Sequence, residues 1–167
     1  MILRPSQKLN TRIKGGTLSV LARHENPLLD WSAHVFAVGR AEYVLLSNTS
    51  SLYSAVLDGA AIRDAARLTE QVLAVIRAVL EGAGRLPDER LAPVETVRFA
   101  KSLGRSVTGS MNELITHAVA CLAHGDLPAA DVGVRLNDTL LSALAVGSDK
   151  YGRPRDAFAA LVVGAGS

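Results

Sequence analysis

The chain has 167 residues, of which 49% are hydrophobic and 20% are charged, and its formal net charge is +2. This length fits one domain, residues 1–167, and the apolar content excludes general disorder. No segment approaches the roughly 20 apolar residues of a membrane span, the start of the chain has no apolar signal region, and the single cysteine, Cys121, excludes an internal disulfide. We therefore expect a soluble, cytoplasmic protein without a membrane partner.

The first half of the chain predicts a strand, a short helix and then a meander of three strands. Met1–Leu3 is the first strand, Pro5 suits the first turn of a short helix that carries Lys8 and Arg12, and Lys14–Asp30 is an irregular connection. Turn residues at Gly39-Arg40 and at Asn48–Ser50 separate three runs of strand-forming residues. Because these connections are short, we predict antiparallel pairing of Trp31–Val38, Glu42–Ser47 and Leu52–Leu57.

The second half is mainly helical. Apolar residues at spacings of three and four predict a helix over Ala61–Ala83, and Pro87 and Pro93 bracket a short connection before a fourth long strand, Val94–Lys101. Three further helices and a loop follow: a helix from Ser110, a helix over Leu127–Asn137, a loop over Gly147–Pro154 and a helix over Asp156–Val163. The fold class is α+β: a small, mainly antiparallel sheet, with one or two strands besides the meander, covered by helices.

The junction between the fourth strand and the next helix is the strongest candidate site. Ser110–Glu113 matches a capping box, and the preceding loop, Gly104–Gly109, has the two-glycine spacing of a phosphate-binding loop. Ser110 and Met111 stand where that motif needs Lys and then Ser or Thr, which argues against nucleotide hydrolysis. Lys101, Arg105, the loop amides and the helix start could still hold a phosphate or a carboxylate. An ordinary strand-to-helix turn is the alternative.

Four residues suited to metal binding lie along one side of the same helix. Glu113, His117, Cys121 and His124 fall within about 80° of one another, but they span about 16 Å of axial rise and cannot all reach one ion. A solvated helix edge is the preferred interpretation, and we predict no metal and no cofactor. Cys121 and a histidine lack an oriented third group for nucleophilic catalysis.

Basic residues cluster near both ends of the chain and could form one face that binds phosphate backbones. The alternative is scattered, solvated charge. The residues concerned are Arg4, Lys8, Arg12, Lys14, Arg98, Lys101, Arg105, Lys150, Arg153 and Arg155.

Several short motifs, in the same order along nearly the whole chain, carry a resemblance to a known family. They are Met1–Arg4, Gln7–Leu9, Asp30–Ala33, Val97–Lys101, Arg105–Val107, Gly109–Asn112 and Arg135–Asn137. On these residues the chain resembles a family of small uncharacterised bacterial proteins known as a domain of unknown function. The resemblance implies a single intracellular domain and no particular activity. Leu140 departs from the pattern, in which a proline is expected after the threonine.

The resemblance singles out polar or aromatic positions that match its motifs. Capping explains Ser110, a turn explains Asn48, and Trp31 suits the core, whereas Lys8, Arg105, Asn112 and Asn137 are harder to explain by folding. This mixture of cations and amides suits recognition of a phosphate, a carboxylate or a base edge. The predicted ligand-binding residues are Lys8, Lys101, Arg105, Ser110, Asn112 and Asn137.

Three functional hypotheses follow. The first is a non-enzymatic binding or regulatory protein that recognises an anionic ligand, with nucleic acid as one candidate, at the Lys101–Asn112 junction. The second is a protein–protein interaction module, either a homodimer or the partner of a co-encoded protein. The third is a hydrolase or nuclease that uses His34, His117 or Glu113, which would have to converge in one pocket.

Overall fold

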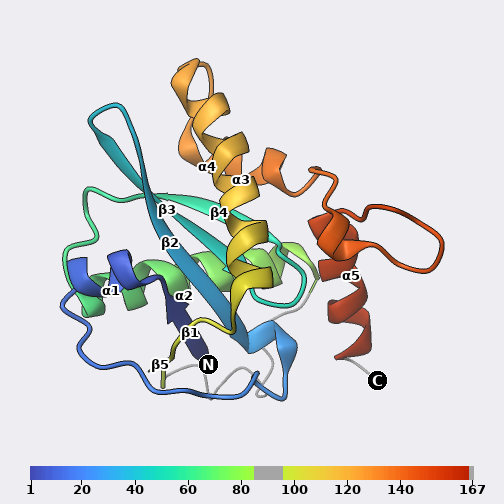
Figure 1. Cartoon of the computed structure of the whole chain (residues 1–167), viewed down its shortest axis with the longest axis horizontal. Helices are drawn as coiled ribbons and strands as arrows, with labels where there is room; N and C mark the ends of the chain where they lie inside the picture. Colours follow the sequence, from blue (N-terminus) through green and yellow to red (C-terminus); the bar gives the residue numbers. More distant parts are fainter. Residues whose placement is uncertain (85–95, 166–167) are drawn as a thin grey trace.

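A computed structural model describes residues 1–84 and 96–165, which form a five-stranded sheet with helices on both faces (Figure 1). The strand order is β4-β3-β2-β1-β5. The strands are β1 (Ile2–Pro5), β2 (Asp30–Val38), β3 (Ala41–Asn48), β4 (Ser54–Asp58) and β5 (Arg98–Phe99). The predicted α+β fold is confirmed.

The meander forms as predicted. β2 pairs with β3 over eight residues, from Trp31 opposite Asn48 to Val38 opposite Ala41, and β3 pairs with β4 in the same antiparallel sense. β1 pairs in parallel with both β2 and β5, so the sheet is mixed although its long pairings are antiparallel. The predicted fourth long strand is wrong in length: within the described residues it is only the two-residue β5, followed by a bridge between Ala100 and Ser19.

Five α-helices and two short 3-10 helices complete the described part of the chain. The α-helices are α1 (Gln7–Arg12), α2 (Ala65–Gly82), α3 (Arg105–Ala123), α4 (Ala129–Leu136) and α5 (Pro154–Gly164), and the 3-10 helices are η1 (Pro27–Leu29) and η3 (Ser142–Leu144). The first helix begins after Ser6, whose side chain caps it, because Pro5 belongs to β1. α2 begins four residues later than predicted because Asp64 caps the Arg67 N–H. The connection expected between Pro87 and Pro93 lies outside the described residues.

The largest correction concerns the start of α3. The predicted loop, Gly104–Gly109, contains the cap and first turns of the helix, and the predicted capping serine, Ser110, lies inside it. Val107, Met111, Leu114 and Ala118 follow helical spacing and are buried against the sheet, so burial of this stripe starts the helix early and accommodates Gly109. The cap itself is Gly104, whose φ of 122° favours glycine.

Two apolar cores lie on opposite faces of the sheet. On one face α1 and α2 pack over Trp31, Val44 and Leu46, with Phe158 of α5 closing the end of this core. On the other face α3 and α4 pack over Phe36 and Leu45. Figure 1 shows α3 crossing in front of the strands and α2 behind them. β1, which has α1 directly after it, and the end of β5 therefore lie at one side of the sheet, away from the α4 edge.

A buried ion pair joins the two parallel strands β1 and β2. The Arg4 side chain is fully buried and Asp30 is 1% exposed. Arg4 Nε donates to Asp30 Oδ1 at 2.8 Å, and Nη2 donates to Oδ2 at 2.9 Å. The remaining guanidinium N–H groups bond the carbonyl oxygens of Leu21, Ala22 and Lys101 at 2.8 to 3.1 Å. Both charges are thus paired and fully hydrogen-bonded, as burial requires.

Substitution of Asp30 by Asn should lower the free energy of unfolding by about 3–5 kcal/mol, because it leaves the Arg4 cation buried without its counter-charge. Asp138 is the matched control. It also accepts from an arginine, Arg155, but the two side chains are about half exposed, so D138N should cost less than about 1 kcal/mol. Chemical denaturation of both variants measures the difference, and equal losses would contradict this account.

Candidate functional site

A polar cleft of about 580 Å³ opens where β1 and β5 end. Pro5 is the last residue of β1, and Lys101 follows β5 by two residues. The first turns of α1 and the turn around Gly16 form the other walls. Six polar side chains line it, from Ser6, Gln7, Asn10, Thr17, Lys101 and Ser102. We refer to this cavity as the Lys101 cleft.

The backbone of Lys101 is held on both sides. Its N–H donates to Ser19 O at 2.8 Å, and its C=O accepts from Arg4 Nη1 at 2.9 Å. Its ammonium group has no ion-pair partner among the described residues, and no acidic side chain lines the cleft. The cleft therefore presents one unneutralised cation together with hydroxyl and amide donors, which is the chemistry of an anion site.

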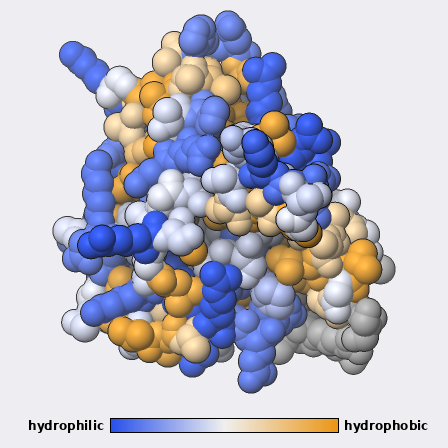
Figure 2. Space-filling model, turned by 45° about the vertical axis from the view of Figure 1, so that its right-hand side comes forward, coloured by the Kyte–Doolittle hydropathy of each residue, from blue (hydrophilic) through white to orange (hydrophobic). Residues whose placement is uncertain are grey.

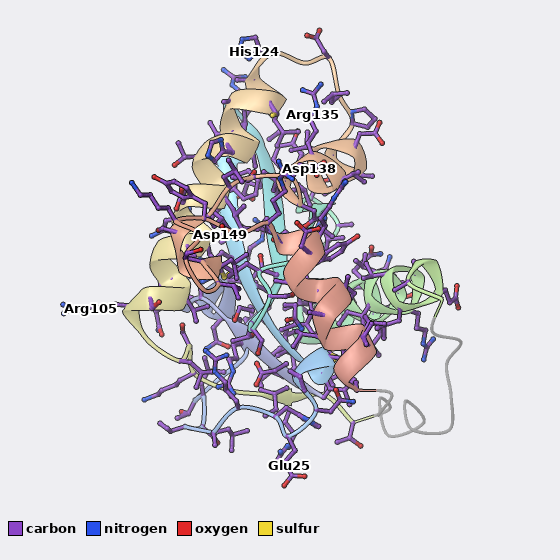
Figure 3. The ribbon with its side chains drawn as sticks, turned by 90° about the vertical axis from the view of Figure 1, so that its right-hand side faces the viewer. Glu25, Arg105, His124, Arg135, Asp138 and Asp149 are labelled. Carbon is purple, nitrogen blue, oxygen red and sulfur yellow. The ribbon has the colours of Figure 1, made fainter. Side chains whose placement is uncertain are left out.

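Most of the residues predicted from the sequence lie elsewhere. Of the six, Lys101 lines the cleft and the other five do not. Arg105 is exposed and extends outward from the start of α3 (Figure 3). Lys8 and Asn112 are also exposed, on α1 and α3. The expected cradle of loop amides is wrong, because the residues from Arg105 onward are helical.

Ser110 and Asn137 serve the fold. Ser110 Oγ donates to Ser106 O at 3.1 Å, one turn back in α3. Asn137 is 4% exposed, accepts from Ser54 N at 2.7 Å and donates to Ser54 O at 3.0 Å, so its amide acts as a further strand partner at the outer edge of β4. It also donates to Gly133 O in α4. Folding therefore accounts for both residues.

The other motif positions are also explained by folding. Trp31 is buried and donates from Nε1 to Leu28 O at 2.8 Å. The Asn48 amide donates to Pro27 O at 2.8 Å and accepts from the N–H groups of Ser50 and Ser51, which fixes the turn between β3 and β4.

The catalytic and metal hypotheses gain no common site. His34 is 7% exposed on β2, whereas Glu113 and His117 are exposed on α3, so the three are not brought to one surface. His124 lies at the opposite end of α3 from Arg105 (Figure 3). Within residues 1–84 and 96–165, no three His, Cys, Asp or Glu side chains are placed to share a metal ion.

The proposed basic face is reduced by ion pairs. Arg4 is buried against Asp30, Arg12 pairs with Glu42, and Arg155 pairs with Asp138. Three of the basic residues named from the sequence therefore already have carboxylate partners.

The electrostatics of two buried groups follow from their contacts. Burial by itself would raise the pKa of the Asp30 carboxyl, but hydrogen bonds from Arg4, the His24 N–H and Thr49 outweigh it and hold that pKa below its ordinary value. Burial lowers the pKa of His34, whose ring has no hydrogen-bond partner among the described residues.

Sequence reasoning missed five of the six polar residues of the cleft. Gln7 belongs to a motif that the resemblance marks, and Gly15-Gly16 is a visible turn signal, but neither predicts that α1 and the end of β5 meet. That meeting depends on the parallel pairing of Ile2 with Arg98, which are far apart in the sequence.

Comparison with known proteins gives a family and nothing more specific. The sequence model of a family described as "Domain of unknown function (DUF6933)" matches residues 2–157. This range contains every residue of the cleft. No curated protein and no solved structure matches the chain. In the described part of the chain, no helix is both long enough and apolar enough to cross a membrane.

The roles of Asn137 and Ser110 can be separated by stability. N137A removes three buried hydrogen bonds and leaves Ser54 N–H and C=O unpaired, so it should lower the free energy of unfolding by about 2–3 kcal/mol. S110A removes one bond inside a helix, and alanine favours helix, so its effect should stay below about 1 kcal/mol. Urea denaturation compares the two. A larger loss in S110A would restore the capping role.

His34 should make the protein less stable in mild acid. Its pKa is lower in the folded chain than the ordinary value of 6.5, so above that pH both states are neutral, and below it the unfolded state binds the proton more readily. The free energy of unfolding should therefore fall as the pH drops below about 6.5.

The variant H34L should flatten this pH dependence, although His24, whose pKa burial also lowers, leaves a smaller slope. The exposed-residue control, H117L, should keep the wild-type slope. Denaturation at a series of pH values between 5 and 8 measures it, and an unchanged slope in H34L would contradict the prediction.

Proposed function

We propose that this chain, which belongs to the DUF6933 family, is a non-enzymatic protein that binds a small anionic ligand in the Lys101 cleft. The observation that carries the proposal is the Lys101 ammonium group, which lines a polar cavity of about 580 Å³ with no acidic residue in its walls. This volume falls within the range of small-molecule sites, about 300–1,000 Å³.

The position of the cleft in the sheet supports the proposal. In open sheets with parallel strands, ligands bind beyond the carboxyl ends of the strands. β1 and β5 are parallel and both end at the cleft. The start of α3 follows Ser102 by two residues, has no side-chain cap and has no acidic residue in its first turn. Its dipole adds a modest preference for negative charge, about 0.3–1 kcal/mol.

A small anion suits the cleft better than a nucleic acid does. An extended phosphate backbone needs several cations on one face, whereas Arg4, Arg12 and Arg155 are paired with carboxylates. A single cation in a cavity suits one phosphate or carboxylate group.

An interaction surface is the second candidate. Leu140, Val146 and Tyr151 are exposed and line a hollow of about 420 Å³ beside α5. However, the apolar residues on the face shown in Figure 2 form separate patches among hydrophilic side chains. We therefore place the anion-binding proposal first.

Titration with inorganic phosphate at low ionic strength tests the proposal. The chain should bind phosphate saturably, with a dissociation constant below about 1 mM, and K101M should weaken binding at least about tenfold because it removes a charged hydrogen-bond donor. R105M, a change of a cation that lies outside the cleft, is the control and should bind within about twofold of wild type. Isothermal titration calorimetry gives the constants.

Two results would decide against the proposal. The first is no binding of phosphate, acetate or citrate by the folded chain at millimolar concentration. The second is tight binding of an RNA or DNA oligonucleotide that depends steeply on salt and is unaffected by K101M. The latter would transfer the function to a basic surface elsewhere.

A further inference from the structure

Asn10 lines the Lys101 cleft and has an unsatisfied acceptor. The residue is 6% exposed, and its Nδ2 donates to Gly16 O at 2.8 Å. Its Oδ1 is buried and has no hydrogen-bond partner, and it is the one side-chain atom among the described residues in that state. Buried amide oxygens in proteins are nearly always paired, so this atom lacks a donor.

The orientation of the amide follows from its surroundings. If the oxygen and nitrogen of Asn10 were exchanged, the oxygen would face the Gly16 carbonyl oxygen, and two acceptors would then oppose each other. The oxygen therefore points away from Gly16. The group that completes the site must be a donor.

The neighbouring glycine restricts access to this oxygen. A Cβ atom at Gly15 would lie 2.0 Å from Asn10 Oδ1, so only a glycine fits there and its backbone covers the oxygen. A donor that comes from the cleft reaches Oδ1 through a small displacement of the Gly15-Gly16 turn. Two consecutive glycines favour such a displacement because they restrict the backbone least.

The cleft thus combines a cation, Lys101, with an acceptor that lacks a donor. A ligand that satisfies both is an oxyanion that still carries a proton. Hydrogenphosphate has a P–O–H donor at neutral pH, whereas sulfate is an acceptor only. We propose that the Lys101 cleft selects a protonated phosphate group, with Asn10 Oδ1 accepting its hydrogen. This inference rests on the anion-binding function proposed above.

Competition between two similar anions tests the selectivity. Phosphate and sulfate are titrated into the full chain under identical conditions by calorimetry. Wild type should prefer phosphate at least about tenfold, which corresponds to about 1.4 kcal/mol. K101M should lose affinity for both anions.

Two variants separate the acceptor from the anchor that Asn10 provides to Gly16. N10A and N10D both lose the Nδ2 donor, but N10D keeps an acceptor at the same place. N10A should bind phosphate and sulfate within about twofold of each other, and N10D should retain the preference for phosphate even if its added charge weakens both. Circular dichroism melts confirm that each variant is folded.

Methyl phosphate distinguishes a free phosphate from a phosphate ester. The ester loses its last proton near pH 6, whereas inorganic phosphate keeps one proton at pH 8. Binding of methyl phosphate should weaken at least about tenfold from pH 5 to pH 8, while inorganic phosphate stays within about threefold. At neutral pH the site would then take the free ion.

The outcomes separate the two proposals. If neither phosphate nor sulfate binds, the anion-binding function is wrong. If both bind equally to wild type, or if methyl phosphate binds as tightly at pH 8 as at pH 5, anion binding stands and the selection of a protonated phosphate is overturned.

Discussion

The ion pair between Arg4 and Asp30 is the constraint on which the arrangement of the N-terminal half depends. A buried guanidinium group must have its charge matched and all five N–H groups bonded. Asp30 supplies the charge and two of the acceptors, and backbone carbonyl groups of Leu21, Ala22 and Lys101 supply the others. One side chain therefore fixes β1 against β2 and holds both the irregular connection and the exit of β5 in place.

The same network determines where the cleft lies and what it contains. Arg4 uses the carbonyl group of Lys101, and Ser19 takes its N–H, so the backbone at this position is fixed while the ammonium group remains without a partner. The positive charge of Arg4 is consumed in the fold, whereas that of Lys101 is placed at the carboxyl ends of β1 and β5. A structural cation thus positions a second cation that is free to contact a ligand.

Local patterns predicted the parts of the fold that local interactions form. The turns at Gly39 and Asn48 specify the meander, and helical spacing specifies α2. The parallel pairing of β1 with β5 has no local signal, because its partners are almost a hundred residues apart and two residues of β5 suffice for it. The start of α3 was misplaced since Gly104 and Gly109 resemble turn residues, whereas the buried stripe from Val107 decides where the helix begins.

The candidate site was harder to predict because polar residues in a motif can serve either the fold or a ligand. Asn137 and Asn10 are both buried asparagines that lie beside glycines, and nothing in their sequence context separates them. The structure separates them by hydrogen bonding: the strand edge and α4 satisfy the amide of Asn137, whereas the oxygen of Asn10 has no partner in the described part of the chain. A polar group that the protein already satisfies is explained by folding. Asn10 Oδ1 and the Lys101 ammonium group remain unsatisfied at one cleft, and this pairing is why we assign binding there rather than at Arg105.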